Sequence, residues 1–209
     1  MILKQYVVGE ISTNNYLLID EISREAVLID CSGNFEEIKK DLEENRGKLK
    51  YILLTHAHFD HIGGAKKFSE YYNIPILMHK DDEMWLDHIK EQCDYFGLPN
   101  FEKPQKIDFI DENTELKIGV NDIKVIHTKG HTKGGLSYLI GNILFSGDTL
   151  FLEEIGRCDL PGGNLTDLKN SIKNKLFTLF PNTRVYPGHG GPTTIKHEII
   201  SNPYFDDEF

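Results

Sequence analysis

Cysteine is scarce in this sequence. Only three of the 209 residues are cysteines, and Cys31, Cys93 and Cys158 lie far apart in the chain. An odd number of cysteines without a Cys-x-x-Cys pair argues against a disulfide framework and against a thiolate zinc site. We therefore expect three reduced thiols and no metal bound through sulfur.

Long hydrophobic runs are also absent. No apolar stretch approaches the roughly 20 residues that span a bilayer. Met1 to Glu10 lacks the basic start, apolar stretch and cleavage site of a signal peptide. The content of 39% hydrophobic and 27% charged residues is ordinary for a folded protein in water. These features predict a cytoplasmic protein that does not contact membranes.

Basic residues are outnumbered by acidic ones. The sequence has 23 Lys and Arg against 33 Asp and Glu, which gives a formal net charge of −10. A field of this sign repels phosphate backbones at long range, so nucleic acid is not an expected partner. The length of 209 residues favours one domain over residues 1–209, with a lid or insertion around residues 92–106.

The first half of the chain alternates between strand and helix patterns. Short runs rich in Ile, Val, Leu and Tyr predict strands, and apolar residues at spacings of three or four predict helices. The expected strands are 2–8, 15–20, 26–30, 49–55 and 75–79, and the expected helices are 35–47, 65–72 and 81–90. Residues 94–105 show no clear period and predict an ordered loop, which is where we place the lid.

The second half repeats this organisation. Strand patterns are expected at 107–110, 115–118, 122–127, 136–140, 143–146 and 183–186. Leu165, Leu168, Ile172, Leu176 and Leu179 predict a long helix that Asn164 caps. Two halves that each contain a meander followed by helices predict an α/β protein with a four-layer αββα sandwich.

Histidine and aspartate gather at the ends of predicted strands. His56, His58, Asp60 and His61 fall within six residues directly after the strand 49–55. Three histidines and a carboxylate this close are rarely needed for packing, whereas imidazole and carboxylate groups suit zinc or iron. His131, Asp148 and His189 also stand beside glycines at predicted strand ends or turns. The pattern predicts a catalytic metal site without thiolates.

These residues resemble the motifs of the metallo-β-lactamase fold superfamily. His56, His58, Asp60 and His61 match its His-x-His-x-Asp-His motif, and the later motifs follow in order as Gly-His-Thr, Gly-Asp-Thr and Pro-Gly-His-Gly. The resemblance implies two metal ions. The first would be held by His56, His58 and His131, the second by Asp60, His61 and His189, with Asp148 bridging both.

The same resemblance implies the chemistry. Two cations that share a carboxylate and a water lower the pKa of that water, so a metal-bridging hydroxide is the expected nucleophile. Asp60 is the expected catalytic residue, because a free oxygen could orient the hydroxide or relay a proton. We expect two divalent ions, zinc first, with iron or manganese as the alternatives.

The loop Gly156–Gly163 is similar to that of short glyoxalase II-like thioesterases. There Arg157 lies nine residues after Asp148 and would bind the thiol part of the substrate. The alternative is that Arg157 only pairs with Asp159 or Glu154. Only 20 residues follow His189, so the helical domain of full-length glyoxalase II is not expected, and other thioesters or small esters are candidate substrates.

The predicted function is metal-dependent hydrolysis of a small-molecule thioester or ester. One alternative is a persulfide dioxygenase. By resemblance, enzymes of that kind share this fold and hold a single iron through residues that match His56, His131 and Asp148. A lactone or ester hydrolase of the same fold is another, and a metal-binding module without catalysis is a third.

The residues outside the motifs have other expected roles. Four aromatic residues either line a substrate mouth or pack the insertion: Trp85, Tyr95, Phe96 and Phe101. Four histidines are expected at the surface or in packing: His79, His88, His127 and His197.

Overall fold

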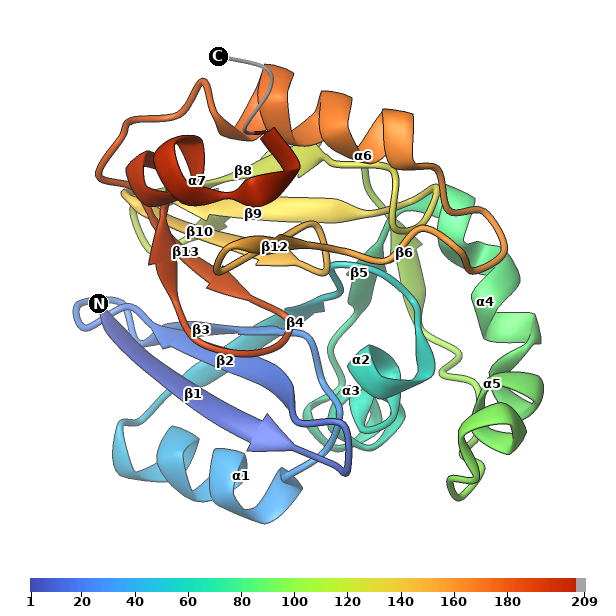
Figure 1. The fold of residues 1–209 in the computed structure, drawn as a ribbon. Helices are drawn as coiled ribbons and strands as arrows, with labels where there is room; N and C mark the ends of the chain where they lie inside the picture. Colours follow the sequence, from blue (N-terminus) through green and yellow to red (C-terminus); the bar gives the residue numbers. More distant parts are fainter. Residues whose placement is uncertain (206–209) are drawn as a thin grey trace.

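The chain folds into two six-stranded sheets packed face to face, with helices on both outer sides (Figure 1). The computed structural model describes residues 1–205. The first sheet has the strand order β1-β2-β3-β4-β5-β6 and the second has the order β14-β13-β10-β9-β8-β7. This is the metallo-β-lactamase fold, and it confirms the predicted αββα sandwich.

The first sheet joins three antiparallel strands to three parallel ones. β1, β2 and β3 pair antiparallel, and β3, β4, β5 and β6 pair parallel. Parallel pairing requires crossovers, and short helices supply them. The elements are β1 Ile2–Val8, β2 Thr13–Ile19, β3 Glu25–Ile29, α1 Phe35–Glu44, β4 Lys48–Leu53, α2 Phe59–Ile62, α3 Ala65–Tyr72, β5 Ile76–Met78, α4 Glu83–Asp87, α5 Ile89–Phe96 and β6 Ile107–Phe109.

The second sheet is antiparallel except where β13 lies parallel to β10. A small hairpin, β11 with β12, follows β10. The elements are β7 Leu116–Ile118, β8 Asn121–His127, β9 Leu136–Ile140, β10 Ile143–Gly147, β11 Leu150–Phe151, β12 Glu154–Ile155, α6 Leu165–Ser171, β13 Arg184–Pro187, β14 Thr193–Thr194 and α7 Ile195–Ser201. A turn of π-helix, Ile172–Leu176, continues α6.

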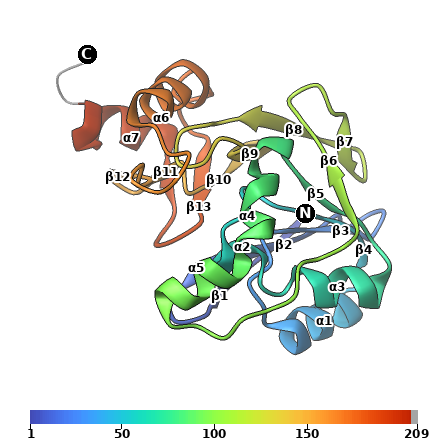
Figure 2. The same cartoon turned by 90° about the vertical axis from the view of Figure 1, so that its right-hand side faces the viewer.

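Alternating side chains of the inner strands serve two separate hydrophobic layers. In β2, Leu17 and Ile19 pack toward α1 and α3, whereas Tyr16 and Leu18 pack toward the second sheet. Successive side chains of a strand point to opposite faces, so a central strand of a four-layer fold is buried on both. A third core lies between the second sheet and α6 with α7. Figure 2 shows α4 and α5 beside this stack, in front of the ends of the sheets.

The prediction of one continuous helix over residues 81–90 is wrong. The structure has a 3₁₀ turn, Lys80–Asp82, followed by α4 and α5, which meet at His88. The His88 ring Nδ1 donates to the Met84 carbonyl at 2.8 Å, and the His88 backbone N–H donates instead to Trp85. The side chain thus takes the carbonyl that a continuous helix would use, and the helix breaks there.

The loop expected from residue 94 begins later than predicted. α5 continues to Phe96 and ends at Gly97, whose φ of +69° is a left-handed conformation that favours glycine at a helix end. The proposed insertion at 92–106 is therefore helical at its start. Gln92 ties it to the fold: its Nε2 donates to the Trp85 carbonyl, and its Oε1 accepts from the Phe59 N–H.

The predicted reduced thiols agree with the described residues. Within residues 1–205, Cys31, Cys93 and Cys158 are all free. No helix in that range has both the length and the apolar character needed to cross a bilayer.

A buried hydroxyl group links the two sheets. The O–H of Tyr138 in β9 donates to the carbonyl of Leu54, the residue after β4, at 2.6 Å. Tyr138 and Leu54 are completely buried, so no water can replace this bond.

Tyr138→Phe is therefore expected to lower the free energy of unfolding by about 1–2 kcal/mol, because it leaves the Leu54 carbonyl without its partner. Tyr51→Phe is the matched control, since the Tyr51 hydroxyl donates to the Lys117 carbonyl at an exposed position. Urea denaturation measures both variants. Equal small losses for the two would contradict this role of Tyr138.

Candidate metal centre

The seven residues expected as metal ligands meet at one edge of the sandwich. His56 and His58 follow β4, and Asp60 and His61 lie on the short helix α2. The second sheet supplies the other three from its own loops: His131 between β8 and β9, Asp148 directly after β10, and His189 after β13. The site therefore forms only when both sheets are packed together.

The ligand atoms form two adjacent groups. The nitrogens of His56, His58 and His131 lie within 4.8 Å of one another. The same holds for ligand atoms of Asp60, His61 and His189. A third set, His56, His61 and Asp148, also lies within 4.8 Å and connects the two groups. The structure thus brings all seven residues together, and their division between two ions stays a prediction.

Asp148 lies between the two groups. Its Oδ2 is 3.6 Å from His131 Nε2 and 3.5 Å from His189 Nε2, and its Oδ1 is 3.4 Å from His61 Nε2. One carboxylate thus faces imidazoles of both groups, as a bridging ligand must.

The buried polar atoms of the centre fit metal ions. Across residues 1–205, His56 Nε2, His61 Nε2 and Asp148 Oδ1 are buried without a hydrogen-bond partner. Buried polar atoms without partners are costly and rare. Here they converge, and imidazole nitrogens with carboxylate oxygens are ligands of zinc and iron. The donor set therefore accounts for the orphaned atoms if divalent cations bind there.

Hydrogen bonds behind the ligands orient the imidazoles. His131 Nδ1 donates to the Arg157 carbonyl at 2.8 Å, and His189 Nδ1 donates to the Ile11 carbonyl at 3.1 Å. His61 Nδ1 bonds to the carboxylate of Asp30 at 2.8 Å. Because each Nδ1 is engaged from behind, Nε2 faces the centre, an arrangement typical of metal-binding histidines.

Two buried carboxylates support the loops that carry the ligands. Asp30 accepts from the Thr55 N–H at 2.7 Å and from its hydroxyl at 2.8 Å, in addition to His61. Asp82 accepts from the Gly134 N–H at 2.7 Å, the Thr132 hydroxyl at 2.9 Å and the Ala57 N–H at 3.3 Å. Asp82 thereby joins the loop of His56 and His58 to the loop of His131.

Sequence reasoning missed both carboxylates. Asp30 carries one signal, its position at the end of the predicted strand next to the ligand strand. Asp82 carries none, because its partners lie 25 to 52 positions away along the chain. Burial raises the pKa of Asp82 to about 6, although its three hydrogen bonds favour the ionised form.

Burial and neighbouring charge set the protonation of the ligands. Burial, with the nearby His131, lowers the pKa of His58 to about 3, and burial also lowers that of His56. Burial alone would raise the pKa of Asp148, but the charges of His61 and His131 outweigh it and lower the value to about 2. Neutral His56 and His58 beside an ionised Asp148 are the forms that bind metals. Burial also acts to lower the pKa of His61, but the charges of Asp60, Asp30 and Asp148 outweigh it and raise that pKa.

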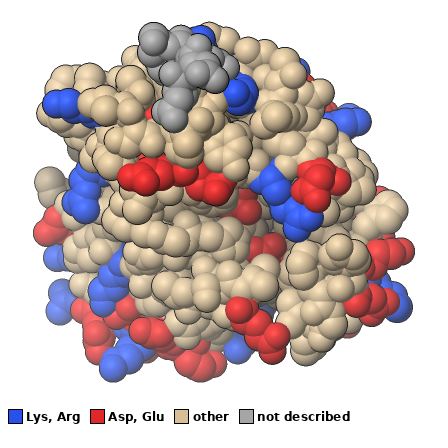
Figure 3. Space-filling view, in the orientation of Figure 1, with Lys and Arg blue, Asp and Glu red and all other residues tan. Residues whose placement is uncertain are grey.

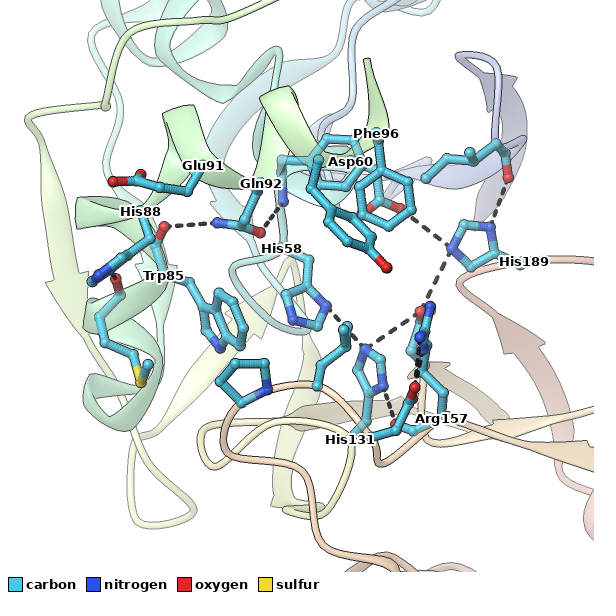
Figure 4. Close-up of a pocket in the computed structure, with 18 of the residues that line it drawn as sticks. His58, Asp60, Trp85, His88, Glu91, Gln92, Phe96, His131, Arg157 and His189 are labelled. Atoms are coloured by element: carbon cyan, nitrogen blue, oxygen red, sulfur yellow. Dashed lines mark hydrogen bonds and ion pairs between the residues drawn. The ribbon is translucent and has the colours of Figure 1, made fainter. Parts of the chain in front are cut away.

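A large apolar cavity opens over the centre. Its volume is about 830 Å³. Of the four aromatic residues expected either to line a mouth or to pack the insertion, Trp85, Tyr95 and Phe96 line the cavity. Phe101 packs against the hydrophobic cores instead. His88, expected at the surface or in packing, also lines the cavity. Figure 4 shows Trp85 and Phe96 on the side opposite His131 and Arg157.

On the face of the molecule shown in Figure 3, basic side chains are scattered among acidic ones.

Arg157 lines this cavity and also pairs with Asp159. Its Nε and Nη2 each donate to an Asp159 oxygen at 2.7 Å. The ion pair with Asp159 that one alternative expects is present, and Arg157 also lines the cavity. Its binding of a substrate stays a prediction.

His79, Asp81 and His127 bring a further set of ligand-type atoms together away from the cavity. The His79 and His127 rings stack with centroids 4.3 Å apart. His79 Nδ1 accepts from the Asp81 N–H, and His127 Nε2 donates to the Lys133 carbonyl. The rings thus stack on each other, and one nitrogen of each ring is engaged by the backbone, which agrees with the packing role expected for both histidines.

Comparison with known proteins identifies the family. The model of the metallo-β-lactamase superfamily matches residues 8–189, a range that includes all seven ligand-type residues. The chain belongs to the metallo-β-lactamase superfamily. It is thus a member of a metal-dependent superfamily of the metallo-hydrolase type, which agrees with the metal-binding cluster seen in the structure.

Two superfamily members resemble the chain along nearly their whole length. The probable metallo-hydrolase YqgX of Bacillus subtilis is 36% identical over 203 residues, which cover 95% of each protein. Hydroxyacylglutathione hydrolase GloC of Haemophilus influenzae is 34% identical over 199 residues, 93% of each.

Three solved structures of the superfamily share the fold and more than 30% of the sequence. The BLEG-1 B3 metallo-β-lactamase has a TM-score of 0.90 and 37% identity, covering 98% of this chain and 100% of its own. TTHA1623 in a di-iron-bound form has a TM-score of 0.87 and 32% identity, and the match covers 96% of this chain and 99% of that protein. ETHE1 from Myxococcus xanthus has a TM-score of 0.77 and 31% identity, and the match covers 97% of this chain and 84% of that protein.

The role of Asp82 can be tested through metal affinity. Asp82→Asn places an amide N–H₂ where a carboxylate oxygen accepts hydrogen bonds, so the two ligand loops lose their common anchor. We expect metal affinity to fall about 10- to 100-fold, the usual effect of losing a group that orients ligands.

Competition with a chromophoric chelator measures this affinity. Asp87→Asn is the control, because Asp87 pairs with Lys103 at the surface of the neighbouring helix α4. An Asp82→Asn protein that binds metal as tightly as the Asp87→Asn protein would contradict the anchoring role.

Proposed function

We propose that the protein is a hydrolase of small-molecule thioesters that uses two divalent metal ions, zinc in the first place. The observation that carries this proposal is the cluster of five histidines and two aspartates beside the cavity, in which Asp148 lies close to His61, His131 and His189. The similarity to GloC, a hydroxyacylglutathione hydrolase by name, supports the thioester as the substrate. Iron and manganese are the alternative metals, and the di-iron form of TTHA1623 supports iron.

The chemistry divides between the metals and the chain. When bound, the two ions supply Lewis acidity, which lowers the pKa of a water and polarises the thioester carbonyl. The net reaction adds the water oxygen to the acyl carbon, breaks the carbon–sulfur bond and delivers a proton to the departing sulfur. The histidines and Asp148 would hold the ions, and the cavity above them would orient the acyl group.

We assign the proton transfer to Asp60. Its Oδ2 accepts a hydrogen bond from the Thr13 hydroxyl at 2.8 Å and lies 3.2 Å from His61 Nε2 and 3.3 Å from His189 Nε2. Burial opposes ionisation of Asp60, but the charge of His61 lowers its pKa. An ionised carboxylate fixed in this way can orient a water and carry its proton to the leaving sulfur.

A persulfide dioxygenase is the second candidate. Three of the seven residues, His56, His131 and Asp148, form the two-histidine and one-carboxylate set used by mononuclear iron oxygenases. The similarity to ETHE1 favours this candidate. A lactone or ester hydrolase is the third, since the same centre and cavity would accept an oxygen ester.

Parallel assays on zinc-loaded and iron-loaded protein separate these candidates. We expect release of thiol from acyl thioesters without oxygen consumption, and we expect the same acyl group as an oxygen ester to react more slowly. Oxygen uptake with a persulfide, together with no cleavage of any thioester by either metal form, would move the assignment to the dioxygenase.

Asp60→Asn tests the proton transfer. The amide still fills the space but cannot take a proton, so we expect kcat to fall at least about 100-fold while His56, His58 and His131 retain their metal. Thr13→Val is the companion variant, because it removes only the hydrogen bond to Asp60 and should cost less. Unchanged turnover in metal-loaded Asp60→Asn protein would remove the role.

A further inference from the structure

The cavity over the metal centre has two unlike sides. The loop after β12 supplies the charged pair of Arg157 and Asp159, whereas α4 and α5 supply Met84, Trp85 and Phe96. Figure 4 shows Trp85 and Phe96 opposite Arg157. A thioester carbonyl has two arms, the acyl group and the thiol. With the carbonyl at the ligands between these sides, one arm would lie along each side.

The side formed by α4 and α5 begins at a ligand-type residue. The Trp85 ring lies edge-on to the His58 ring, with centroids 4.5 Å apart. Phe96 stacks on Phe59, the residue between His58 and Asp60, with centroids 4.9 Å apart. A group attached to a carbonyl at the centre therefore meets aromatic surface on this side before it reaches solvent.

This side also leaves large apolar side chains uncovered. The exposed fractions are 39% for Met84, 40% for Phe96 and 76% for Tyr95, and all three residues line the cavity. The Tyr95 and Phe96 rings lie edge to face with centroids 5.0 Å apart. Burial of apolar surface that faces water is favourable, so an apolar group of a ligand would gain free energy here.

Two polar residues of the same side are engaged in hydrogen bonds within the chain. Gln92 uses both ends of its amide, because Oε1 accepts from the Phe59 N–H and Nε2 donates to the Trp85 carbonyl. His88 Nδ1 donates to a backbone carbonyl of α4. A polar acyl group would have to compete with these bonds, whereas an apolar group would not.

We propose that the side formed by α4 and α5 is an acyl-binding site that selects aromatic or medium-chain apolar acyl groups over small ones such as acetyl. The proposal rests on the proposed function and names the acyl half of its substrate. The thiol half lies on the side of Arg157, and glutathione fits this division. The cavity volume of about 830 Å³ is large for a small-molecule pocket and leaves room for both halves. Phe96 is the specificity-determining residue, because it lies at the cavity and its ring stacks on Phe59.

Binding of stable thioethers tests this without turnover. S-methylglutathione and S-hexylglutathione carry the same charges and the same thiol half, so their contacts with the metal ions and with Arg157 cancel in the ratio of the two dissociation constants. Both compounds are titrated by calorimetry into zinc-loaded protein. We expect the hexyl compound to bind about 10- to 100-fold more tightly, because its additional methylene groups are buried.

Three variants test the role of Phe96 at full metal loading. Phe96→Ala should reduce the ratio about three- to tenfold by weakening the binding of the hexyl compound alone. Phe96→Leu keeps an apolar side chain and should retain most of the ratio. Phe180→Ala is the matched control, because Phe180 is 65% exposed and lies outside the cavity lining, and it should leave the ratio unchanged.

Three binding results would overturn the proposal: equal affinity of the two thioethers for the wild-type protein, an unchanged ratio in Phe96→Ala, or equal losses in Phe96→Ala and Phe180→Ala. Hydrolysis of acetylglutathione and hexanoylglutathione with equal kcat/KM would also refute the selectivity, while the thioesterase function would stand. If the binding ratios follow expectation but neither thioester is hydrolysed, the thioesterase function fails while the apolar binding site stands.

Discussion

The structure depends on one constraint: five imidazoles and two carboxylates turn their lone pairs toward one another in a largely buried space. His56, His58, His61 and His131 are almost completely buried. Such a cluster is costly unless cations compensate it or protons are shared within it. Burial acts to lower the pKa of His61, but Asp60, Asp30 and Asp148 outweigh it and raise that pKa, so a proton on His61 compensates part of their negative charge. Divalent ions supply the same compensation with more charge.

Contacts between the two sheets keep this cluster assembled. The Leu136 N–H donates to the Thr55 carbonyl at 2.7 Å, directly beside His56. The Asn14 N–H donates to the Gly188 carbonyl at 2.7 Å, and the Tyr16 hydroxyl donates to the Pro187 carbonyl, next to His189. The loops of His56 and His189 are thus fixed from the opposite sheet, so metal binding is expected to be coupled to packing of the sandwich. Trp85 of α4 and Tyr95 and Phe96 of α5 line the cavity beside these ligands.

Periodicity and local motifs predicted much of this architecture. Short apolar runs indicated β2 and β4, spacings of three and four indicated α1 and α6, and strand-end histidines indicated the metal centre. Asn164 caps α6 as expected, accepting from the Asp167 N–H. The sequence did not reveal α7, because its signal is a single capping residue, Thr194, with few apolar positions behind it.

The remaining features arise from contacts between distant residues. Asp82 reaches Gly134 across 52 positions, and nothing around Asp82 in the sequence distinguishes it from a surface aspartate. The break at His88 depends on which donor takes the Met84 carbonyl, a competition that the apolar spacing of this segment does not encode. Arg157 was foreseen with two possible partners, and only the three-dimensional loop shows that its pairing with Asp159 coexists with a place at the cavity.

The most direct test of this account is anomalous X-ray diffraction from crystals of the metal-loaded protein, measured at the zinc and iron absorption edges. The account predicts two peaks per chain, one among His56, His58 and His131 and one among Asp60, His61 and His189, with Asp148 between them. A single peak at full metal loading, with the residues of the second group hydrogen-bonded to one another, would contradict it.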